Sequence, residues 1–247
     1  MALRYFGSKS WLKEKLADLI PKDTKIIVSP FLGRGKAELH LAKTRPNIVA
    51  MGSDLFEPLV NFHQKLQDGS LFEPLQAWVD ASLSKEEHTK LLASMDSLPC
   101  DQRAAAFFMI TRNSFHGKFG SYYEADKLTK RTIEMISRQR LPNFHVDRRD
   151  AFETIRDAPD GAVIFADPPY FQSRKYYAKA QQGDLDFQKK LAEALKARGL
   201  PFVLCTNDAL EVLELYSDCC IEAHKHARRT SGKHTKHYNE IVVVSGL

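Results

Sequence analysis

A strand, a turn, a helix and a second strand follow one another within the first 54 residues, and this order leaves few folds open. Residues 25–30 form a short β-branched run typical of a buried strand, and a glycine-containing turn comes next. Residues 36–43 have apolar side chains at helical spacing, and residues 48–52 form a second apolar run that leads to Asp54. This pattern is typical of a βαβ unit and predicts a parallel sheet.

The same alternation returns late in the chain, after an interruption. Residues 62–141 show helical periods with almost no strand signal, which predicts a mainly helical insertion into a catalytic domain of residues 1–61 and 142–247. The last two strands are joined by a basic loop, which favours an antiparallel pair. We therefore expect an α/β fold with seven strands. The five strands after the first two are expected at 144–146, 162–166, 201–205, 219–223 and 241–244. Helices are expected at 11–20, 36–43, 57–67, 71–81, 85–95, 101–111, 127–140, 151–156, 186–197 and 209–215.

Composition excludes several classes of protein. A chain of 247 residues with 43% hydrophobic residues can bury one large core, and no apolar run approaches the roughly 20 residues of a membrane helix. The start lacks a secretory apolar region. Four cysteines match neither a disulfide scaffold nor a zinc spacing, so we expect a reduced, cytoplasmic protein with no membrane and no metal. The net charge of +5 is informative only through its placement.

The most informative tetrapeptide is Asp167-Pro168-Pro169-Tyr170, which follows an apolar strand. Such a strand delivers it to the carboxyl edge of a parallel sheet, where α/β folds place ligands. The two prolines lack backbone donors and leave the Pro168 carbonyl as a free acceptor. This carbonyl and the Asp167 carboxylate can accept both hydrogens of an NH₂ group on a planar ring while Tyr170 stacks on the ring. A Pro-Pro turn that only closes the strand is the alternative.

A second motif, Phe31-Leu32-Gly33-Arg34-Gly35, follows the first strand. Its glycines let the backbone approach a ligand closely, although it lacks the full G-x-G-x-x-G fingerprint. Asp54 lies about 20 residues further on, where a carboxylate can accept hydrogen bonds from ribose hydroxyls. An ordinary strand-to-helix turn and a solvated acid are the alternatives for these two features.

In one order and over nearly the whole chain, the sequence resembles the Dam-type (D12 class) DNA adenine-N6 methyltransferases. Residues 4–9 match the family's N-terminal basic-aromatic motif, Phe31–Gly35 its cofactor loop, and Asp54 its ribose-binding acid. Asp167–Tyr170 matches its catalytic motif. The segments 150–152, 206–208 and 228–241 resemble further family patterns, and the insertion lies where the family keeps its target-recognition domain.

The resemblance implies a Rossmann-like fold that uses S-adenosylmethionine to methylate the N6 amine of an adenine flipped out of double-stranded DNA. Catalysis would rest on positioning and electrostatics and would need no metal. The resemblance also assigns a catalytic role to Asp167, Pro168, Pro169 and Tyr170, and cofactor contacts to Tyr5, Lys9, Phe31, Gly33, Gly35, Asp54, Asp150, Phe152 and Asp167.

Positive charge gathers in two regions. Residues 225–238 hold five Lys or Arg and no acid, and we interpret them as a flexible loop that fits DNA phosphates, with a solvated basic hairpin as the alternative. The other region is the insertion and its exit, where interleaved aromatics suit either a wedge into stacked bases or packing in the insertion's own core. We expect DNA contacts from Arg4, Asn113, Phe115, His116, Lys118, Arg228, Arg229 and Lys233.

The loop after Asn113 departs from the family pattern. Family members that read GATC place an arginine there on a longer hairpin, whereas this chain has Lys118 and Gly120. Guanine is best read by a bidentate basic side chain, so we expect relaxed or short-site specificity, which would suit a phage or prophage member. A cytosine-N4, RNA or protein amide methyltransferase and a catalytically silent DNA-binding module are the alternatives. No obligatory protein partner is evident, and the sequence leaves the host, a restriction partner, the oligomeric state and the timing of proton removal open.

Overall fold

The computed structural model describes residues 3, 5, 11–171, 184–229 and 235–247. Within these ranges the chain forms seven strands, ten α-helices and two short 3₁₀ helices. In chain order the elements are α1 (Leu12–Leu19), β1 (Ile26–Ser29), α2 (Lys36–Thr44), β2 (Val49–Asp54), α3 (Glu57–Asp68), α4 (Phe72–Gln76), α5 (Lys85–Ser94), η1 (Met95–Ser97), α6 (Cys100–Arg112), η2 (Phe115–Gly117), α7 (Lys130–Ser137), β3 (Phe144–Arg148), α8 (Ala151–Arg156), β4 (Val163–Ala166), α9 (Leu185–Arg198), β5 (Phe202–Asn207), α10 (Leu210–Leu215), β6 (Cys220–Arg229) and β7 (Thr235–Ser245).

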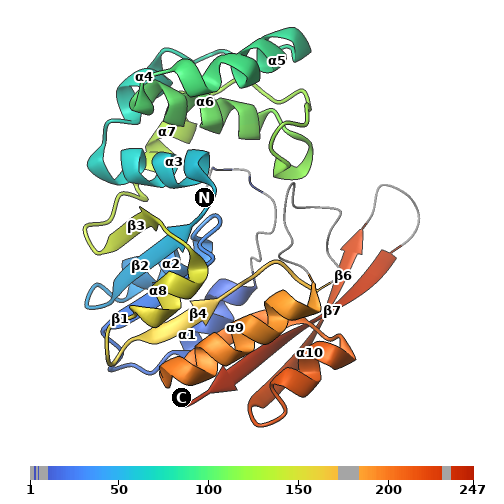
Figure 1. Cartoon of the computed structure of the whole chain (residues 1–247). Coiled ribbons are helices and arrows are strands. Elements are labelled where there is room, and N and C mark those ends of the chain that lie inside the picture. The colour runs from blue at the N-terminus through green and yellow to red at the C-terminus, as the bar shows by residue number, and fades with distance from the viewer. Residues whose placement is uncertain (1–2, 4, 6–10, 172–183, 230–234) are drawn as a thin grey trace. The chain divides into compact units, whose positions relative to one another are not determined.

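The strands form one sheet in the order β3-β2-β1-β4-β5-β7-β6 (Figure 1). β1, β4 and β5 are parallel, as are β2 and β3, whereas β7 is antiparallel to both β5 and β6. The predicted seven-stranded α/β sheet with an antiparallel final pair is therefore confirmed. The strand order reverses between β1 and β4, and open α/β sheets bind ligands at the carboxyl ends of the strands that flank such a point.

Burial explains why β1 and β4 were visible in the sequence. All four residues of β4 are buried, and so are three of the four in β1. A parallel strand that is covered on both faces reads as a continuous apolar run rather than as an alternating one. These two strands place the Phe31–Gly35 loop and the Asp167–Tyr170 motif directly after their carboxyl ends.

The chain divides into two compact units, the first made of residues up to Ala17 together with Leu32–Asp150. In this unit a helical segment, α3 to α7, lies between β2 and β3 (Figure 1). Its core is built mainly by α3 and α6, where Phe62 and Phe108 stack with ring centroids 6.0 Å apart. A second cluster, which includes Val60, Ala50 and Val146, packs α3 on β2 and β3.

The second unit consists of Asp18–Phe31 and Ala151–Leu247. Its core joins β1, β4, β5 and β7 to α9, with Leu191 and Leu195 of that helix packed among strand residues such as Ile164 and Leu204. α9 starts sharply because the Asp184 carboxylate accepts a hydrogen bond from the Phe187 backbone N–H at 2.8 Å. No helix in the part of the chain that the structure describes is both long and apolar enough to cross a membrane.

Two helices are shorter than their apolar spacing predicted. α4 covers only Phe72–Gln76 instead of 71–81, and the chain turns at Asp80, which has a φ of 64°. α7 covers Lys130–Ser137 instead of 127–140, because the Thr129 hydroxyl accepts a hydrogen bond from the Thr132 N–H at 3.2 Å and caps the helix there. Capping depends on local geometry that apolar periodicity does not report.

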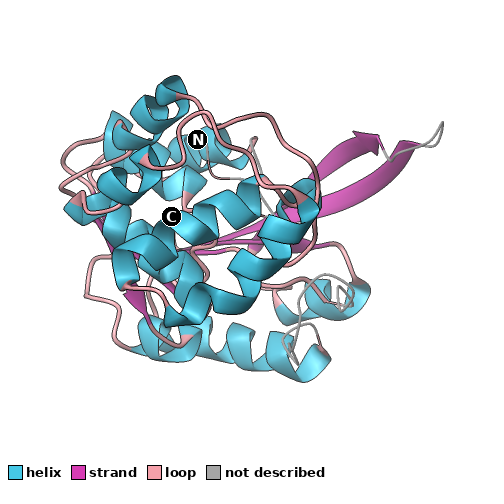
Figure 2. Ribbon diagram, turned by 90° about the horizontal axis from the view of Figure 1, so that it is seen from above, coloured by secondary structure: helices cyan, strands magenta, loops and turns pink. Residues whose placement is uncertain are grey.

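The interpretation of residues 225–238 as a flexible loop is wrong for most of that range. β6 continues to Arg229 and β7 begins at Thr235, and Lys225–Arg229 pair in antiparallel register with Thr235–Asn239 (Figure 2). An antiparallel ladder satisfies backbone donors and acceptors whatever the side chains are, so a polar, basic ribbon shows no apolar strand signal.

Candidate active site

The Asp167–Tyr170 motif lies directly after β4, beside β1. The Ser29 hydroxyl at the end of β1 donates to the Phe165 carbonyl at 3.1 Å and so joins the two strands just before the motif. Asp167 is half-buried and both prolines are buried. The Tyr170 hydroxyl lies 3.3 Å from Cys205 Sγ on β5, which holds the ring by its polar end. Burial, and then the nearby Cys205, Asp167 and Glu240, raise the pKa of Tyr170 well above its ordinary value, so this hydroxyl stays neutral.

The Phe31–Gly35 loop is bound to Asp54. The Gly33 backbone N–H donates to Asp54 Oδ2 at 3.0 Å, and the Phe56 N–H donates to Oδ1 at 2.9 Å. Gly33 and Gly35 have φ values of 50° and 61°, which side-chain-bearing residues rarely adopt. At Gly35 a Cβ would also lie 3.1 Å from the Leu32 and Phe144 side chains, so the turn requires glycine there.

The surroundings of Asp54 fit the ribose of the cofactor that the resemblance implies. Burial raises the pKa of this carboxyl, although the N–H groups of Phe56, Gly33 and Leu55 act in the opposite direction. Each carboxylate oxygen has lone pairs beyond the one that its backbone donor uses. Two hydroxyl donors would therefore complete the hydrogen bonding of this carboxylate and stabilise its charged form.

Three aromatic rings in the second unit fit an apolar ring system. The ring centroids of Phe31 and Phe187 are 6.1 Å apart, and those of Phe152 and Phe187 are 5.7 Å apart, in edge-to-face arrangements. Phe31 and Phe152 were predicted site residues, and the structure brings them to one aromatic residue of α9. Phe187 was missed because an aromatic at helical spacing in an amphipathic segment reads as ordinary core.

His63 on α3 was also missed, and it holds the same loop. Its Nε2 lies 3.1 Å from the Gly33 carbonyl oxygen, and its ring packs against Phe62 and Phe144. The residue is fully buried, and burial lowers its pKa to about 4 despite the hydrogen bond to Gly33. The imidazole is therefore neutral near pH 7 and donates through Nε2. A lone histidine on an apolar helix face gives no sequence signal for such a role.

We expect the buried His63 to make stability depend on pH. The unfolded chain binds a proton at this histidine near pH 6.5, whereas the folded chain does so only near pH 4, so the free energy of unfolding falls as the pH drops through that window. The contribution amounts to roughly 3 kcal/mol between those limits. In urea unfolding between pH 4 and 7.5, His63→Leu should therefore show a flatter dependence on pH than the wild type.

The matched control for this prediction is His145→Leu, because His145 lies on β3 with an exposed side chain. This variant should keep the pH dependence of the wild type. Equal slopes for His63→Leu and the wild type between pH 4 and 6.5 would contradict a buried, neutral His63.

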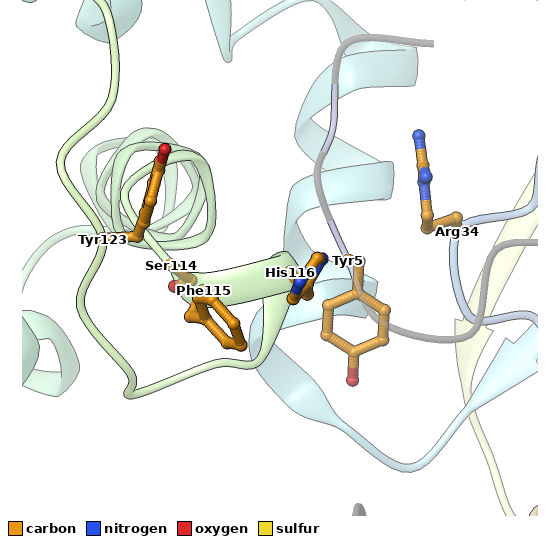
Figure 3. Close-up of a pocket in the computed structure, with 6 residues that line it drawn as sticks. All are labelled: Tyr5, Arg34, Ser114, Phe115, His116 and Tyr123. Carbon is orange, nitrogen blue, oxygen red and sulfur yellow. The ribbon is translucent and has the colours of Figure 1, made fainter. Parts of the chain in front are cut away.

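A pocket of about 450 Å³ in the first unit gathers several predicted DNA-binding residues. It is lined by Ser114, Phe115 and His116 at and just before η2, by Tyr123, and by Tyr5 and Arg34 from other parts of the chain (Figure 3). Phe115 and Tyr123 are each 52% exposed, which is unusual for large aromatics. His116 has a φ of 52°, a strained conformation for a residue with a side chain.

Arg34 lines the pocket but was not among the predicted site residues. Burial lowers the pKa of its guanidinium. Burial, and then the charges of Arg34 and Lys13, lower the pKa of Lys36 at the start of α2, whereas Glu14, which pairs with Lys13 at 3.3 Å, acts in the opposite direction. Arg34 therefore lies near a second cation, Lys36. Inside the Phe31–Gly35 motif the arginine looked like an ordinary variable position.

The other predicted DNA-binding residues fall into distinct surroundings. Lys118 is exposed, whereas Asn113 is fully buried and its amide donates to the Leu83 carbonyl at 3.4 Å. An amide held in this way supports the loop, and contact between Asn113 and DNA stays a prediction. Arg228 and Arg229 lie on β6. Arg4, Lys9 and Lys233 lie outside the described residues.

Two further predicted cofactor residues are among those that the structure describes. Tyr5 is half-buried and stacks on Phe56 with centroids 6.2 Å apart. Asp150 is half-buried directly before α8. Within the described ranges, no three His, Cys, Asp or Glu residues are grouped as metal ligands.

The chain is similar to several known proteins. The chain is 26% identical to the type II methyltransferase M1.LlaDCHI of Lactococcus lactis subsp. cremoris, over 93% of this chain and 88% of that protein. It is 24% identical to the DNA N-6-adenine-methyltransferase of Escherichia phage P1, over 87% of this chain and 31% of that protein. A solved precorrin-6y C5,15-methyltransferase from Geobacter metallireducens GS-15 superposes with a TM-score of 0.46 at 11% identity, over 96% of this chain and 89% of that one. The model of the D12 class N6 adenine-specific DNA methyltransferases matches residues 5–231, and the chain belongs to this family.

Proposed function

We propose that Asp167, the Pro168 carbonyl and Tyr170 hold the target amine during methyl transfer. The chain is an S-adenosylmethionine-dependent enzyme that methylates the N6 amine of adenine in DNA. The observation that carries the assignment of residues is the position of the Asp167–Tyr170 motif after β4, at the point where the strand order reverses. The Phe31–Gly35 loop leaves the neighbouring strand β1 at the same edge.

The proposed role of these residues follows from the chemistry of the amine. The lone pair of adenine N6 is delocalised into the ring, so the amine is a poor nucleophile. Two acceptors, the Asp167 carboxylate and the Pro168 carbonyl, would bind both hydrogens and concentrate the lone pair on nitrogen. Tyr170 would stack on a base flipped out of the duplex, with its hydroxyl kept at Cys205. Catalysis would then rest on orientation and electrostatics.

Several residues are proposed as contacts of the cofactor. The carboxylate of Asp54 would accept hydrogen bonds from the ribose hydroxyls, the Phe31–Gly35 backbone would lie against the cofactor, and Phe31 and Phe152 would contact its adenine. Tyr5, Lys9 and Asp150 are further proposed contacts. When bound, S-adenosylmethionine supplies the electrophilic methyl group.

The helical insertion and its loop would bind the target. We propose that Phe115 and His116 contact double-stranded DNA, and that Arg34 with the nearby Lys36 binds a backbone phosphate. The loop from Asn113 to Tyr123 is short: the Phe115 N–H donates to Ser121 Oγ at 3.0 Å, and the Tyr123 N–H donates to the Asn113 carbonyl at 2.8 Å. A short loop with Lys118 and no arginine favours relaxed or short-site specificity. The protein would act inside the cell, where its DNA substrate is found.

Sequencing of DNA methylated in vitro tests this proposal. With labelled S-adenosylmethionine and a duplex of random sequence, the labelled nucleoside should be N6-methyladenosine in its deoxy form, spread over many sequence contexts. Because no side chain is expected to make a bidentate contact with guanine, discrimination against other bases at a guanine position should be about 1–3 kcal/mol weaker than in an enzyme that has such a contact. Methylation confined to one four-base site would contradict relaxed specificity.

The same libraries separate phosphate binding from base reading at Arg34. Arg34→Ala should weaken DNA binding about equally in all contexts and reduce the slope of log K against log salt by about one. Arg156→Ala, which removes an exposed arginine paired with Asp157, is the control and should leave both quantities unchanged. A changed distribution of methylated sites in Arg34→Ala would instead assign base reading to Arg34.

A further inference from the structure

Gln188 on α9 contacts the backbone of the Asp167–Tyr170 motif. It is fully buried, and its Nε2 donates to the Pro169 carbonyl oxygen at 3.0 Å. Its Oε1 is also buried and has no hydrogen-bond partner among the residues that the structure describes. The residue lies on the helix face that carries Leu191 and Leu195 into the core, where an apolar side chain would be expected.

The unpartnered oxygen indicates why an amide is present at this position. A buried acceptor without a donor destabilises the fold, and leucine or methionine would fill similar space without that cost. The hydrogen bond that the Gln188 NH₂ group donates therefore explains the amide at this position, whereas packing does not. That donor is committed to one atom, the carbonyl oxygen of Pro169.

Holding the Pro169 carbonyl also orients the carbonyl before it. Pro169 has no N–H, and its ring fixes φ, so the peptide plane between Pro168 and Pro169 cannot turn about that bond. Peptide planarity then links the Pro168 carbonyl rigidly to Pro169. The ψ rotation of Pro169 is then the one backbone torsion between the two carbonyls, and the hydrogen bond from Gln188 restricts it by holding the Pro169 carbonyl oxygen.

Other contacts secure the motif beyond Pro169. The Tyr170 hydroxyl lies at Cys205 Sγ, and the Asn207 amide donates to the Phe171 carbonyl at 3.4 Å. Both of these contacts come from β5 and reach residues that follow the two prolines in the chain. The Gln188 contact reaches the proline pair itself, from a different element.

We propose that Gln188 is a positioning residue for methyl transfer, which keeps the Pro168 carbonyl aimed at the target amine. This inference rests on the proposed role of Asp167 and Pro168 as the amine's acceptors. It predicts that Gln188 substitutions lower kcat and leave the binding of cofactor and DNA nearly unchanged.

The sharpest test replaces Gln188 by its isostere, Gln188→Glu. A protonated glutamic acid can donate to the Pro169 carbonyl, whereas the ionised form cannot and repels that oxygen. Burial raises the pKa of a glutamic acid, up to about 8–9 in documented cases. We expect kcat of Gln188→Glu to approach the wild-type value near pH 6 and to fall about tenfold or more below it by pH 9.

A second variant and a control complete this test. Gln188→Leu should lower kcat about tenfold at every pH, with a pH profile parallel to that of the wild type. Lys189→Gln changes the net charge as Gln188→Glu does, but at the next, exposed position of α9, and should leave kcat and its profile unchanged. Calorimetric titration with S-adenosylmethionine and thermal unfolding of each variant provide readouts besides activity.

Two outcomes would overturn the inference. One is a kcat of Gln188→Leu within twofold of the wild type, and the other is a ratio of Gln188→Glu to wild-type kcat that does not change with pH. If Gln188→Leu fails to fold, the pH dependence of Gln188→Glu alone decides. Retained turnover in Asp167→Ala would remove the proposed function itself, whereas an inactive Asp167→Ala beside an active Gln188→Leu would remove only this inference.

Discussion

Asp167→Ala should abolish methyl transfer to DNA while the affinities for S-adenosylmethionine and for DNA stay within about tenfold of the wild type. The reason is that Asp167 is proposed to act on the amine in the transition state, where the nitrogen lone pair must be free to attack. Alanine leaves the Pro168 carbonyl as one acceptor for two hydrogens, and the amine loses both its orientation and its activation. Single-turnover kinetics with labelled cofactor measure the loss.

Two further variants sharpen this experiment. Asp167→Asn keeps the shape of the side chain but can place an NH₂ group toward the amine, so it should also be severely impaired. Glu193→Ala removes an exposed acid of α9 and should keep full activity. Turnover by Asp167→Ala at more than a small fraction of the wild-type rate would exclude Asp167 from the central role.

Asp54→Ala should weaken the binding of S-adenosylmethionine by about ten- to a hundredfold, because a hydrogen bond to a charged group contributes about 1.5–3 kcal/mol. The substitution also removes the acceptor for the Gly33 N–H, so the Phe31–Gly35 loop loses its anchor. The effect should appear in KM for the cofactor, with kcat at saturation much less affected, in contrast to Asp167→Ala. Titration calorimetry with S-adenosylhomocysteine gives the affinity without turnover.

Conservative replacement separates the two functions of Asp54. Asp54→Asn keeps an amide oxygen for the Gly33 N–H but loses the charge, so its affinity for the cofactor should fall between those of the wild type and Asp54→Ala. Asp147→Ala, at an exposed position on the neighbouring strand β3, is the control and should bind as the wild type does. Unchanged cofactor affinity in Asp54→Ala would refute the ribose contact.

The Asp167–Tyr170 and Phe31–Gly35 motifs were found in the sequence because each directly follows a strand with a distinct local pattern. Continuous burial makes β1 and β4 apolar throughout, and proline or glycine marks the residues that leave them. The contact between Gly33 and Asp54 appears only in the structure, where the ends of neighbouring strands of the βαβ unit meet at one edge. Helix ends were less predictable, since Thr129 starts α7 through a single side-chain hydrogen bond.

Local sequence therefore determined the buried strands, their order as α/β units, the two motifs and the family. The tertiary structure alone revealed the contacts of His63 with Gly33 and of Gln188 with Pro169, which join residues 30 and 19 positions apart. Both side chains lie on helix faces that look like ordinary core, and their function depends on which carbonyl each meets after packing. The paired ribbon of β6 and β7 was hidden for a related reason, because its stability comes from backbone hydrogen bonds that leave no apolar pattern in the sequence.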